Sequence, residues 1–423
     1  MRARLDRHWP LLVGGLFLLP ACSRAQAPAG GSAPTLTFVE SWPEQTVLDL
    51  PNIPDAPVVW QEVMDRAGSR IDIASFYFSR PGDGEDSYGP ERVTDRLTPV
   101  LNAVARAAGD RGAAVRVLAD AKFNSTYPEV PAWLDAHDGI TTRTFDAQTA
   151  FGSSGVLHAK YFLVDDDEFY IGSQNWDWRA LGQIHELGVL VRQPALAADL
   201  RRVFDLDWSL AAGEDPPQGS DTPGATAPVV TVAGDTVTAH IVASPRDHLP
   251  AGIPWDLPQI VEMIDAAGDS VHVQLLSYGV TDRKKRLFDD LDSALRRAAV
   301  RGVDVRMIVS NWSTSRYSLP WLQSLAKVPG IEIRVTSIPE HSGGFIPFAR
   351  VEHAKYLTCD GRALWIGTSN WSRDYFFDSR NVGLIAAGAG APRDADRFFN
   401  LSWRGPYAQT LDPCGQYSPP RRN

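Results

Sequence analysis

The sequence H-A-K-Y-F-L-V-D at residues 158–165 is followed, six residues later, by G-S-Q-N at 172–175. The same pattern returns as H-A-K-Y-L-T-C-D at 353–360 and, after another six residues, as G-T-S-N at 367–370. The residues at matching offsets are His158, Lys160, Asp165, Gly172, Ser173 and Asn175, and then His353, Lys355, Asp360, Gly367, Thr368 and Asn370. Two matches of this length predict a duplicated fold in which both halves build one active site.

The residue types in this pattern suit the handling of a phosphate group. Side chains two positions apart on a strand point to the same face, so each His-x-Lys pair presents an imidazole and an ammonium together. The imidazole can attack phosphorus or protonate a leaving oxygen, and the ammonium offsets phosphate charge. The glycines at 172 and 367 let a loop approach closely, and the hydroxyl and amide groups after them are neutral donors. Two facing halves supply both a nucleophile and an acid, which one half cannot do.

The two aspartates of the pattern are predicted to be structural. Asp165 and Asp360 each stand where a strand enters a turn, a position where aspartate binds nearby backbone N–H groups. The acidic run at 165–168 lacks the alternating ligands and the glycine of a calcium loop, so it is interpreted as a solvated turn. The formal net charge of −10 argues against a uniformly basic nucleic-acid-binding face and leaves a local basic cleft open.

The duplication extends beyond the histidine motifs and predicts an α/β fold. The segment at 101–118 matches the one at 291–308, each with a helical pattern, a glycine stop and a strand pattern. Alternating strands and helices indicate two α/β/α sandwich domains related by an approximate two-fold axis, with one active site at their interface. The stretch at 211–228, rich in Pro, Gly and Ala, is the predicted linker between domains at 38–210 and 229–412.

The first residues of the chain are predicted to be a targeting segment. Three arginines precede a short apolar run at 11–19, which is shorter than the about 20 residues needed to span a bilayer. The ending Leu-Pro-Ala-Cys resembles a bacterial lipobox, which predicts cleavage before Cys22 and lipidation of its thiol, with plain signal-peptide cleavage as the alternative. Residues 1–22 are therefore interpreted as signal and 23–37 as a flexible linker. We expect an exported protein, periplasmic or attached to the outer membrane or cell envelope.

With Cys22 lipidated, two cysteines remain. Cys359 and Cys414 can form one disulfide in an oxidising compartment if they meet, which sequence does not decide. Two cysteines do not make a zinc site.

The motifs resemble those of the phospholipase D superfamily. The similarity is greater to one branch, the animal lysosomal phospholipase D-like 5′-exonucleases and the poxvirus envelope phospholipase, and it runs from about residue 38 to residue 403. The segments that carry it are I-D-I-A-S-F-Y (71–77), G-S-Q-N-W-D-W-R-A-L-G-Q-I-H-E-L-G-V (172–189), I-P-F-A-R-V-E-H-A-K-Y (346–356) and G-T-S-N-W-S-R-D-Y-F (367–376).

This resemblance implies a two-step reaction without metal or cofactor. One histidine attacks phosphorus and forms a phosphohistidine, and the other protonates the leaving oxygen and then activates water or an alcohol. His158 and His353 take these roles by position, with His158 as the hypothetical nucleophile. The residues expected to hold phosphate are Lys160, Lys355, Asn175 and Asn370, assisted by Ser173 and Thr368.

In this family an acidic residue usually follows each motif and orients a catalytic imidazole. Glu186 fits this role in the first half, whereas Asn381 stands at the matching place in the second. An imidazole beside a carboxylate is more basic than one beside an amide, so the two histidines are expected to differ in role. The aromatic residues Phe76, Tyr77, Tyr278 and Trp312 are candidates for the cleft lining or for the core, and Arg350 for a contact with substrate phosphate or a surface role.

These expectations define a phosphodiesterase whose substrate is open. A phospholipid is the leading hypothesis because a membrane anchor is predicted, with hydrolysis or transfer of the head group as the reaction. A 5′-exonuclease on single-stranded DNA or RNA is the alternative, and it would require a basic groove with stacking aromatic rings. A non-catalytic lipid- or partner-binding lipoprotein is the third hypothesis, supported only by Asn381. Sequence does not determine the oligomeric state.

Overall fold

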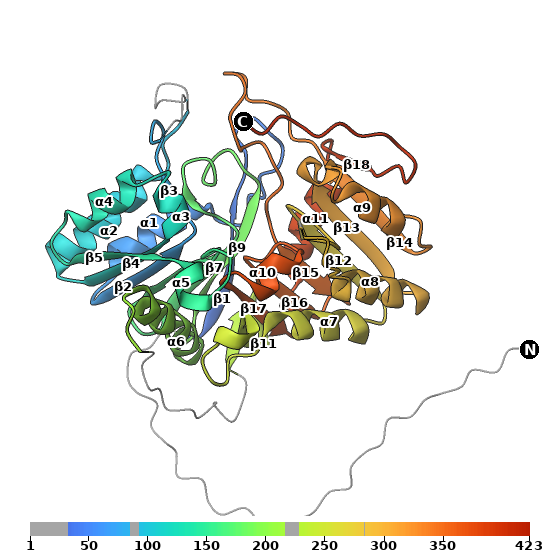
Figure 1. The fold of residues 1–423 in the computed structure, drawn as a ribbon. Helices are drawn as coiled ribbons and strands as arrows, with labels where there is room; N and C mark the ends of the chain where they lie inside the picture. Colours follow the sequence, from blue (N-terminus) through green and yellow to red (C-terminus); the bar gives the residue numbers. More distant parts are fainter. Residues whose placement is uncertain (1–32, 85–92, 216–227, 283) are drawn as a thin grey trace, which may run out of the picture. The chain divides into compact units, whose positions relative to one another are not determined.

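The computed structural model describes residues 33–84, 93–215, 228–282 and 284–423. The predicted signal at 1–22 with Cys22 lies outside these residues, as do most of the predicted linkers at 23–37 and 211–228. Residues 34–423 form one compact unit, in which the described strands build a 16-stranded sheet and a separate two-stranded one (Figure 1). The two domain ranges stay predictions, because one sheet runs through both halves.

The large sheet repeats its strand order on either side of its centre. From the centre outward the first half contributes β1 (Thr35–Ser41), β9 (Glu186–Arg192), β7 (Glu168–Gly172), β6 (Lys160–Val164), β2 (Arg70–Ser75), β4 (Ala114–Asp120) and β5 (Ile140–Phe145). The second half contributes β11 (Asp235–Ser244), β17 (Asn381–Ala387), β16 (Ala363–Gly367), β15 (Tyr356–Cys359), β12 (Ser270–Leu275), β13 (Asp304–Ser310) and β14 (Ile331–Thr336). Strand β10 (Val229–Val232) joins β1 to β11, and β18 (Ala408–Thr410) is added at the β14 edge. This order confirms the duplicated α/β fold.

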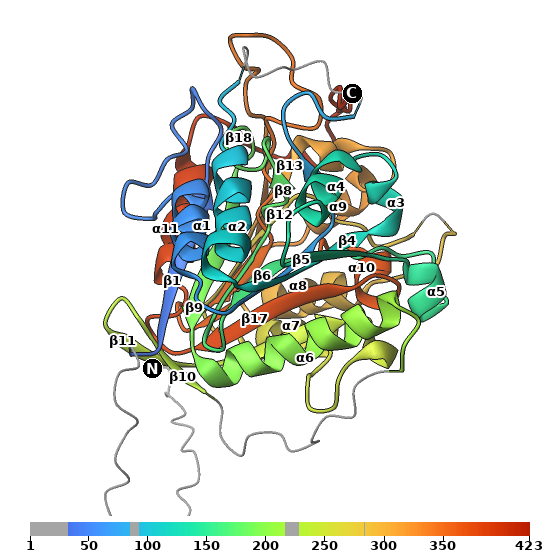
Figure 2. The same cartoon turned by 90° about the vertical axis from the view of Figure 1, so that its left-hand side faces the viewer.

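Helices cover both faces of this sheet. The first half contains α1 (Ala56–Arg66), α2 (Thr98–Arg111), α3 (Ala121–Asn124), α4 (Glu129–Asp135), α5 (Ala147–Phe151) and α6 (Pro194–Ala211). The second contains α7 (Asp256–Ala266), α8 (Asp290–Val300), α9 (Leu319–Leu325), α10 (Arg373–Phe377) and α11 (Arg393–Arg404). Sheet strands lie between the α1–α2 pair and α6 (Figures 1 and 2). Apolar side chains of α6 and α11 share one central core, so both halves are joined through buried hydrophobic contacts.

The two motif aspartates hold turns, as expected. Both have a left-handed backbone, with φ of 49° at Asp165 and 54° at Asp360, which short polar side chains tolerate. The Asp165 carboxylate accepts hydrogen bonds from the N–H groups of Gly68, Ser69 and Arg70. Asp360 accepts the matching three from Gly268, Asp269 and Ser270. Each aspartate therefore ties the end of its motif strand to the strand beside it, far from the histidine.

A buried ion pair joins the two halves. Arg380, directly before β17, donates to both carboxylate oxygens of Asp207 on α6, and both side chains are fully buried. The same guanidinium donates to the carbonyl oxygens of Ser244 and His248, so its donors are almost all used. Removing one partner of such a pair leaves an uncompensated buried charge.

We therefore expect Asp207→Ala to lower the free energy of unfolding by about 3–5 kcal/mol. The matched control is Asp265→Ala, which breaks an ion pair with Arg297 whose side chains are 37% and 49% exposed, and we expect it to cost less than about 1 kcal/mol. Urea unfolding followed by circular dichroism measures both. Equal costs for the two variants would contradict a stabilising role of the buried pair.

Among the helices of the described residues, none combines the length and the apolar character needed to cross a bilayer. The two remaining cysteines are free, with Cys359 buried in strand β15 and Cys414 exposed near the C-terminus. The disulfide between them that sequence left open is therefore not formed.

Candidate active site

The backbone N–H of each motif histidine, just before its strand begins, donates a hydrogen bond to the opposite half of the protein. The His158 N–H donates to the carbonyl of Arg380, which precedes β17, and the His353 N–H donates to the carbonyl of His185, which precedes β9. These bonds are 2.9 Å long in both halves. The pseudo-two-fold relation therefore places each histidine beside the strand that follows the other motif.

The side-chain partners cross between halves in the same way. His353 Nδ1 lies 2.7 Å from Glu186 Oε2, and His158 Nδ1 lies 3.0 Å from Asn381 Oδ1. Sequence reasoning identified Glu186 and Asn381 as the asymmetric pair, but numbering alone did not show which histidine each one contacts. The carboxylate belongs to His353 and the amide to His158.

The hydrogen bonds around Asn381 define the tautomer of His158. Asn381 Nδ2 donates to the carbonyl of Tyr375 at 2.8 Å, and its Oδ1 also accepts from Thr368 Oγ1 at 2.9 Å. The amide oxygen must therefore face His158, so Nδ1 of that imidazole carries the proton. The Nε2 atom of neutral His158 keeps a lone pair, which is what a nucleophile needs.

The electrostatic surroundings distinguish the two imidazoles. Burial together with the charges of Lys160 and Lys355 holds the pKa of His158 well below its usual value, and the hydrogen bond that His158 donates to Asn381 Oδ1 opposes this. Burial also lowers the pKa of His353, but there the Glu186 carboxylate acts in the opposite direction. Burial would raise the pKa of Glu186, yet His353 and Lys355 outweigh it and keep this carboxyl ionised. His353 is thus the imidazole with a built-in counter-ion.

The two motif lysines lie buried behind the histidines. Lys160 Nζ donates to the carbonyl of His158 at 2.7 Å, and Lys355 Nζ donates to the carbonyl of His353. Burial lowers the pKa of Lys160 well below its usual value and that of Lys355 to about 7, opposed in both cases by Glu186. A phosphate anion bound in front of the histidines would favour the charged forms of both lysines by Coulomb attraction.

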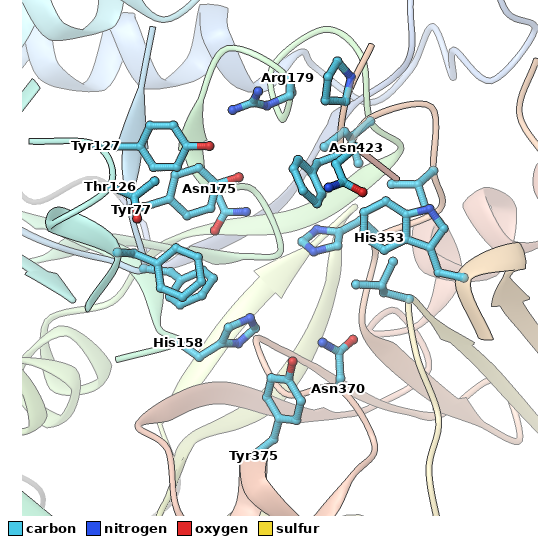
Figure 3. A pocket seen from close by; sticks show the side chains of 18 of the residues that line it. Tyr77, Thr126, Tyr127, His158, Asn175, Arg179, His353, Asn370, Tyr375 and Asn423 are labelled. Atoms are coloured by element: carbon cyan, nitrogen blue, oxygen red, sulfur yellow. The ribbon is translucent and has the colours of Figure 1, made fainter. Parts of the chain in front are cut away.

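A cavity of about 890 Å³ opens between the two halves in front of these groups. Figure 3 shows His158 and His353 pointing into it from opposite halves, with Asn175 and Asn370 nearby. Aromatic rings from the first half form one wall, and Trp312 and Phe348 from the second half contribute to the other. The aromatic residues of the first wall are Phe76, Tyr77, Phe123 and Tyr127.

Several cavity residues were not identified from sequence. Tyr375, on α10, packs edge-on against the His158 ring at a centroid distance of 4.8 Å, and its hydroxyl points into the cavity (Figure 3). Phe123 and Tyr127 follow strand β4, where the end of a parallel strand was the available signal. Arg179 and Asn423 also line the cavity, and nothing in their sequence surroundings marks them.

Four of the six residues expected to hold or assist phosphate lie behind the cavity. Lys160 and Lys355 are 1% and 0% exposed and are not among the residues that line it. Ser173 and Thr368 are fully buried and do not line the cavity. Thr368 Oγ1 donates to Asn381 Oδ1, and in the corresponding place Ser173 Oγ donates to the carbonyl of Leu187 and lies beside Glu186, whose pKa it helps to lower. The strand alternation turns these hydroxyls towards the partner of each histidine, so they orient that partner rather than contact a ligand.

Two other candidates for substrate binding lie away from the cavity, and for Tyr278 the core alternative holds. Tyr278 is buried in the second-half core, and its hydroxyl donates to Asp292 away from the cavity. Arg350 is 6% exposed and donates to the carbonyls of Pro339 and Glu44 and to Gln183 Oε1, so it ties the halves together. Tyr77, Phe76 and Trp312 do line the cavity, as the cleft hypothesis expected.

Two opposed His-x-Lys pairs on a duplicated α/β fold define the class of two-lobed phosphodiesterases. A family model described as "PLD3/4, PLD-like domain" matches residues 90–337. The protein named "5'-3' exonuclease PLD3" of Bos taurus is 33% identical over 402 residues, covering 89% of this chain and 80% of that protein. The chain belongs to the phospholipase D superfamily, in its PLD3/4 branch.

Other similar proteins carry different names. The "Phospholipase D Z" of Dictyostelium discoideum is 27% identical over 365 residues, covering 82% of this chain and 85% of that protein. The solved phosphatidylserine synthase of Haemophilus influenzae Rd KW20 superposes with a TM-score of 0.58 at 12% identity, covering 84% of this chain and 85% of that one. That likeness concerns the fold, which accordingly carries more than one named activity.

Proposed function

We propose that this protein is a metal-independent 5′-exonuclease that removes nucleotides from single-stranded DNA or RNA through a phosphohistidine intermediate. The observation that carries the proposal is the aromatic wall beside His158. Phe76 lies 4.0 Å from Phe123 between ring centroids, and Tyr77 is stacked on Tyr127 at 5.5 Å. Nucleobases stack on such rings without regard to sequence. The names of the PLD3 relatives support the same substrate class.

The size of the cavity suits the end of a strand. A volume of about 890 Å³ is in the range of sites that enclose a ligand of a few hundred daltons, and so holds a terminal nucleotide and its phosphodiester. Burial lowers the pKa of both Lys160 and Lys355, so these two side chains would supply local positive charge once a phosphate anion is bound, in a protein whose formal net charge is −10. Arg179 adds a further cation to the cavity lining, as single-strand binding requires of the site.

The chemistry follows from the two imidazoles. His158 Nε2 attacks phosphorus and forms a P–N bond, while the P–O bond to the leaving oxygen breaks and His353 gives that oxygen its proton. A water molecule then transfers a proton to His353 and attacks phosphorus, and the P–N bond breaks to regenerate His158. Lys160, Lys355 and the amides of Asn175 and Asn370 offset the negative charge that grows on the phosphoryl oxygens.

Hydrolysis or transfer of a phospholipid head group is the second candidate. It is favoured by the apolar rings at the cavity mouth, where Phe348 is 44% exposed beside Trp312. The name of the Dictyostelium relative points the same way. Export and anchoring through Cys22 belong to this proposal, because an anchor would hold the cavity near its substrate.

One experiment distinguishes the candidates. The purified chain is offered, with EDTA present, a 5′-hydroxyl single-stranded oligonucleotide and vesicles of phosphatidylcholine or phosphatidylglycerol, each in a separate reaction. Stepwise shortening of the oligonucleotide from its 5′ end, absent in His158→Ala, supports the exonuclease. Release of head group or phosphatidic acid with an intact oligonucleotide would replace it by the phospholipase. Turnover of neither would favour the non-catalytic lipoprotein.

The aromatic wall makes a separate prediction. We expect Tyr127→Ala to raise the KM for an oligonucleotide about 10-fold, because stacking on one base is worth about 1–3 kcal/mol. Turnover of bis(p-nitrophenyl) phosphate, which is too small to need that ring, should change little. Tyr317→Ala is the matched control, since this tyrosine is 61% exposed and outside the cavity. If the aromatic wall has no role in binding, the KM for the oligonucleotide will be the same in Tyr127→Ala and Tyr317→Ala as in the unmodified chain.

A further inference from the structure

A second cross-half pair lies directly behind Glu186 and His353. His185 Nδ1 is 2.9 Å from Glu352 Oε2, and the two side chains are 0% and 1% exposed. The His185 ring is stacked on Phe398 of α11 at 4.1 Å, and Ser402 Oγ lies 3.4 Å from both polar partners. Burying an imidazole and a carboxylate costs desolvation free energy, which the hydrogen bond between them only partly offsets. Such a pair therefore calls for an explanation beyond stability.

The backbone explains why the two pairs are back to back. The His185 N–H donates to the carbonyl of Val351, and the His353 N–H donates to the carbonyl of His185. The segments 185–186 and 352–353 therefore run side by side as extended chain, in which successive side chains point to opposite faces. Glu186 and His353 face the cavity side, and His185 and Glu352 face the core behind it.

The other histidine has a different arrangement at the corresponding place. Leu157 precedes His158 and is bridged to Arg380, whose charge is matched by Asp207 of α6. No carboxylate therefore precedes His158, whereas Glu352 precedes His353 and lies three residues before Lys355. The first half uses a carboxylate from another element: Asp120, at the end of β4, accepts from the Leu157 N–H and acts to raise the pKa of Lys160. In the second half the charge of Glu352 comes from the motif segment itself and is additional to Glu186.

We propose that His185 and Glu352 are a positioning pair for the second half of the site: they fix the segment that carries His353 and Lys355, and they add the charge of one carboxylate behind it. This inference rests on the proposed function in one respect: it takes the site between the two histidines to bind a phosphate-like anion. Glu352 does not reach the cavity, so it acts through Lys355 and His353 and not on the substrate.

The charges around Lys355 determine the direction of the effect. Glu186 and Glu352 face it on the negative side, and Lys160, His158 and His353 on the positive side. Burial lowers the pKa of Lys355 to about 7, and the two glutamates oppose this. Its contribution to anion binding is present below that pKa and is lost as the pH rises through it. Removing the Glu352 charge therefore moves the loss to lower pH.

The test measures anion binding without turnover. Calorimetric titration with sulfate, whose charge is constant over this range, is carried out on the full chain from pH 5.5 to 9. We expect the midpoint of the affinity loss to fall by about one pH unit in Glu352→Gln. The midpoint should be unchanged in Glu352→Asp, because that variant keeps the carboxylate. It should not fall in His185→Gln, because Glu352 is still present there. Asp396→Asn is the matched control, because it removes the partner of His272 in a similar pair outside the cavity.

Each outcome decides the proposal. A midpoint in Glu352→Gln equal to that of the unmodified chain overturns it, even if affinity drops by a constant factor, because a purely structural role predicts that pattern. If Glu352→Gln does not fold, the apolar double variant His185→Leu/Glu352→Leu tests the same shift. The two proposals can fail separately. If sulfate binding shows the expected shift but the protein cleaves no phosphodiester, the proposed function is wrong and this inference still holds.

Discussion

Replacing His158 with alanine is expected to lower kcat on any phosphodiester by about 10⁴-fold or more, because the proposed nucleophile, and with it the proposed P–N bond, would be lost. His353→Ala should differ in kind. With bis(p-nitrophenyl) phosphate, whose leaving group needs no proton, the first step still proceeds in this variant. The second step stalls, because His353 is no longer present to activate water.

A burst of nitrophenolate followed by slow turnover is therefore expected in His353→Ala, together with a phosphoryl adduct on the peptide that contains His158. Stopped-flow absorbance and mass spectrometry under alkaline conditions measure these two quantities. An adduct on His353 in the His158→Ala variant, with none in the converse, would reverse the roles assigned from the hydrogen bonds of Asn381 and Glu186.

The second large effect is expected at Glu186. Glu186→Gln removes the carboxylate that lies 2.7 Å from His353 Nδ1, so the pKa of His353 falls further and the general acid loses its proton at lower pH. We expect kcat to drop by about 10²- to 10⁴-fold, in line with the loss of an orienting carboxylate behind a catalytic imidazole. The alkaline limb of the kcat/KM profile should move to lower pH.

Asn381→Asp provides the matched comparison, because it places a carboxylate beside the other histidine. The pKa of His158 should rise, and since attack requires the neutral imidazole, the acid limb should move to higher pH. Profiles measured from pH 4 to 9 separate the two limbs. If both variants moved the same limb, the two histidines would have no distinct roles, and the asymmetry would be without mechanistic meaning.

Much of the fold could be predicted because strand periodicity and turn chemistry are local. The His-x-Lys spacing placed each imidazole and its lysine on one strand, and the structure has β6 and β15 there. The turn preference of aspartate correctly predicted Asp165 and Asp360 as structural residues. The repeated order of helices and strands indicated a duplicated α/β fold, although the continuity of the sheet through β10 was not foreseen.

The errors concern side chains whose role depends on what faces them. Ser173 and Thr368 have the composition of phosphate ligands, but the pleat turns them towards Glu186 and Asn381. Arg350 looked available to substrate, yet its carbonyl partners come from segments as distant in sequence as Glu44. Such contacts depend on long-range packing, about which local patterns carry no information.

The sequence by itself determined the family, the duplicated fold and the two histidines, because these depend on residue type at constant offsets along the chain. Only the tertiary structure decided which partner belongs to which histidine. Glu186 follows His158 by twenty-eight residues and yet serves His353, because the pseudo-two-fold axis lays the strand after each motif beside the histidine of the other. The aromatic wall and the His185–Glu352 pair arise from the same crossing, which no spacing within one half encodes.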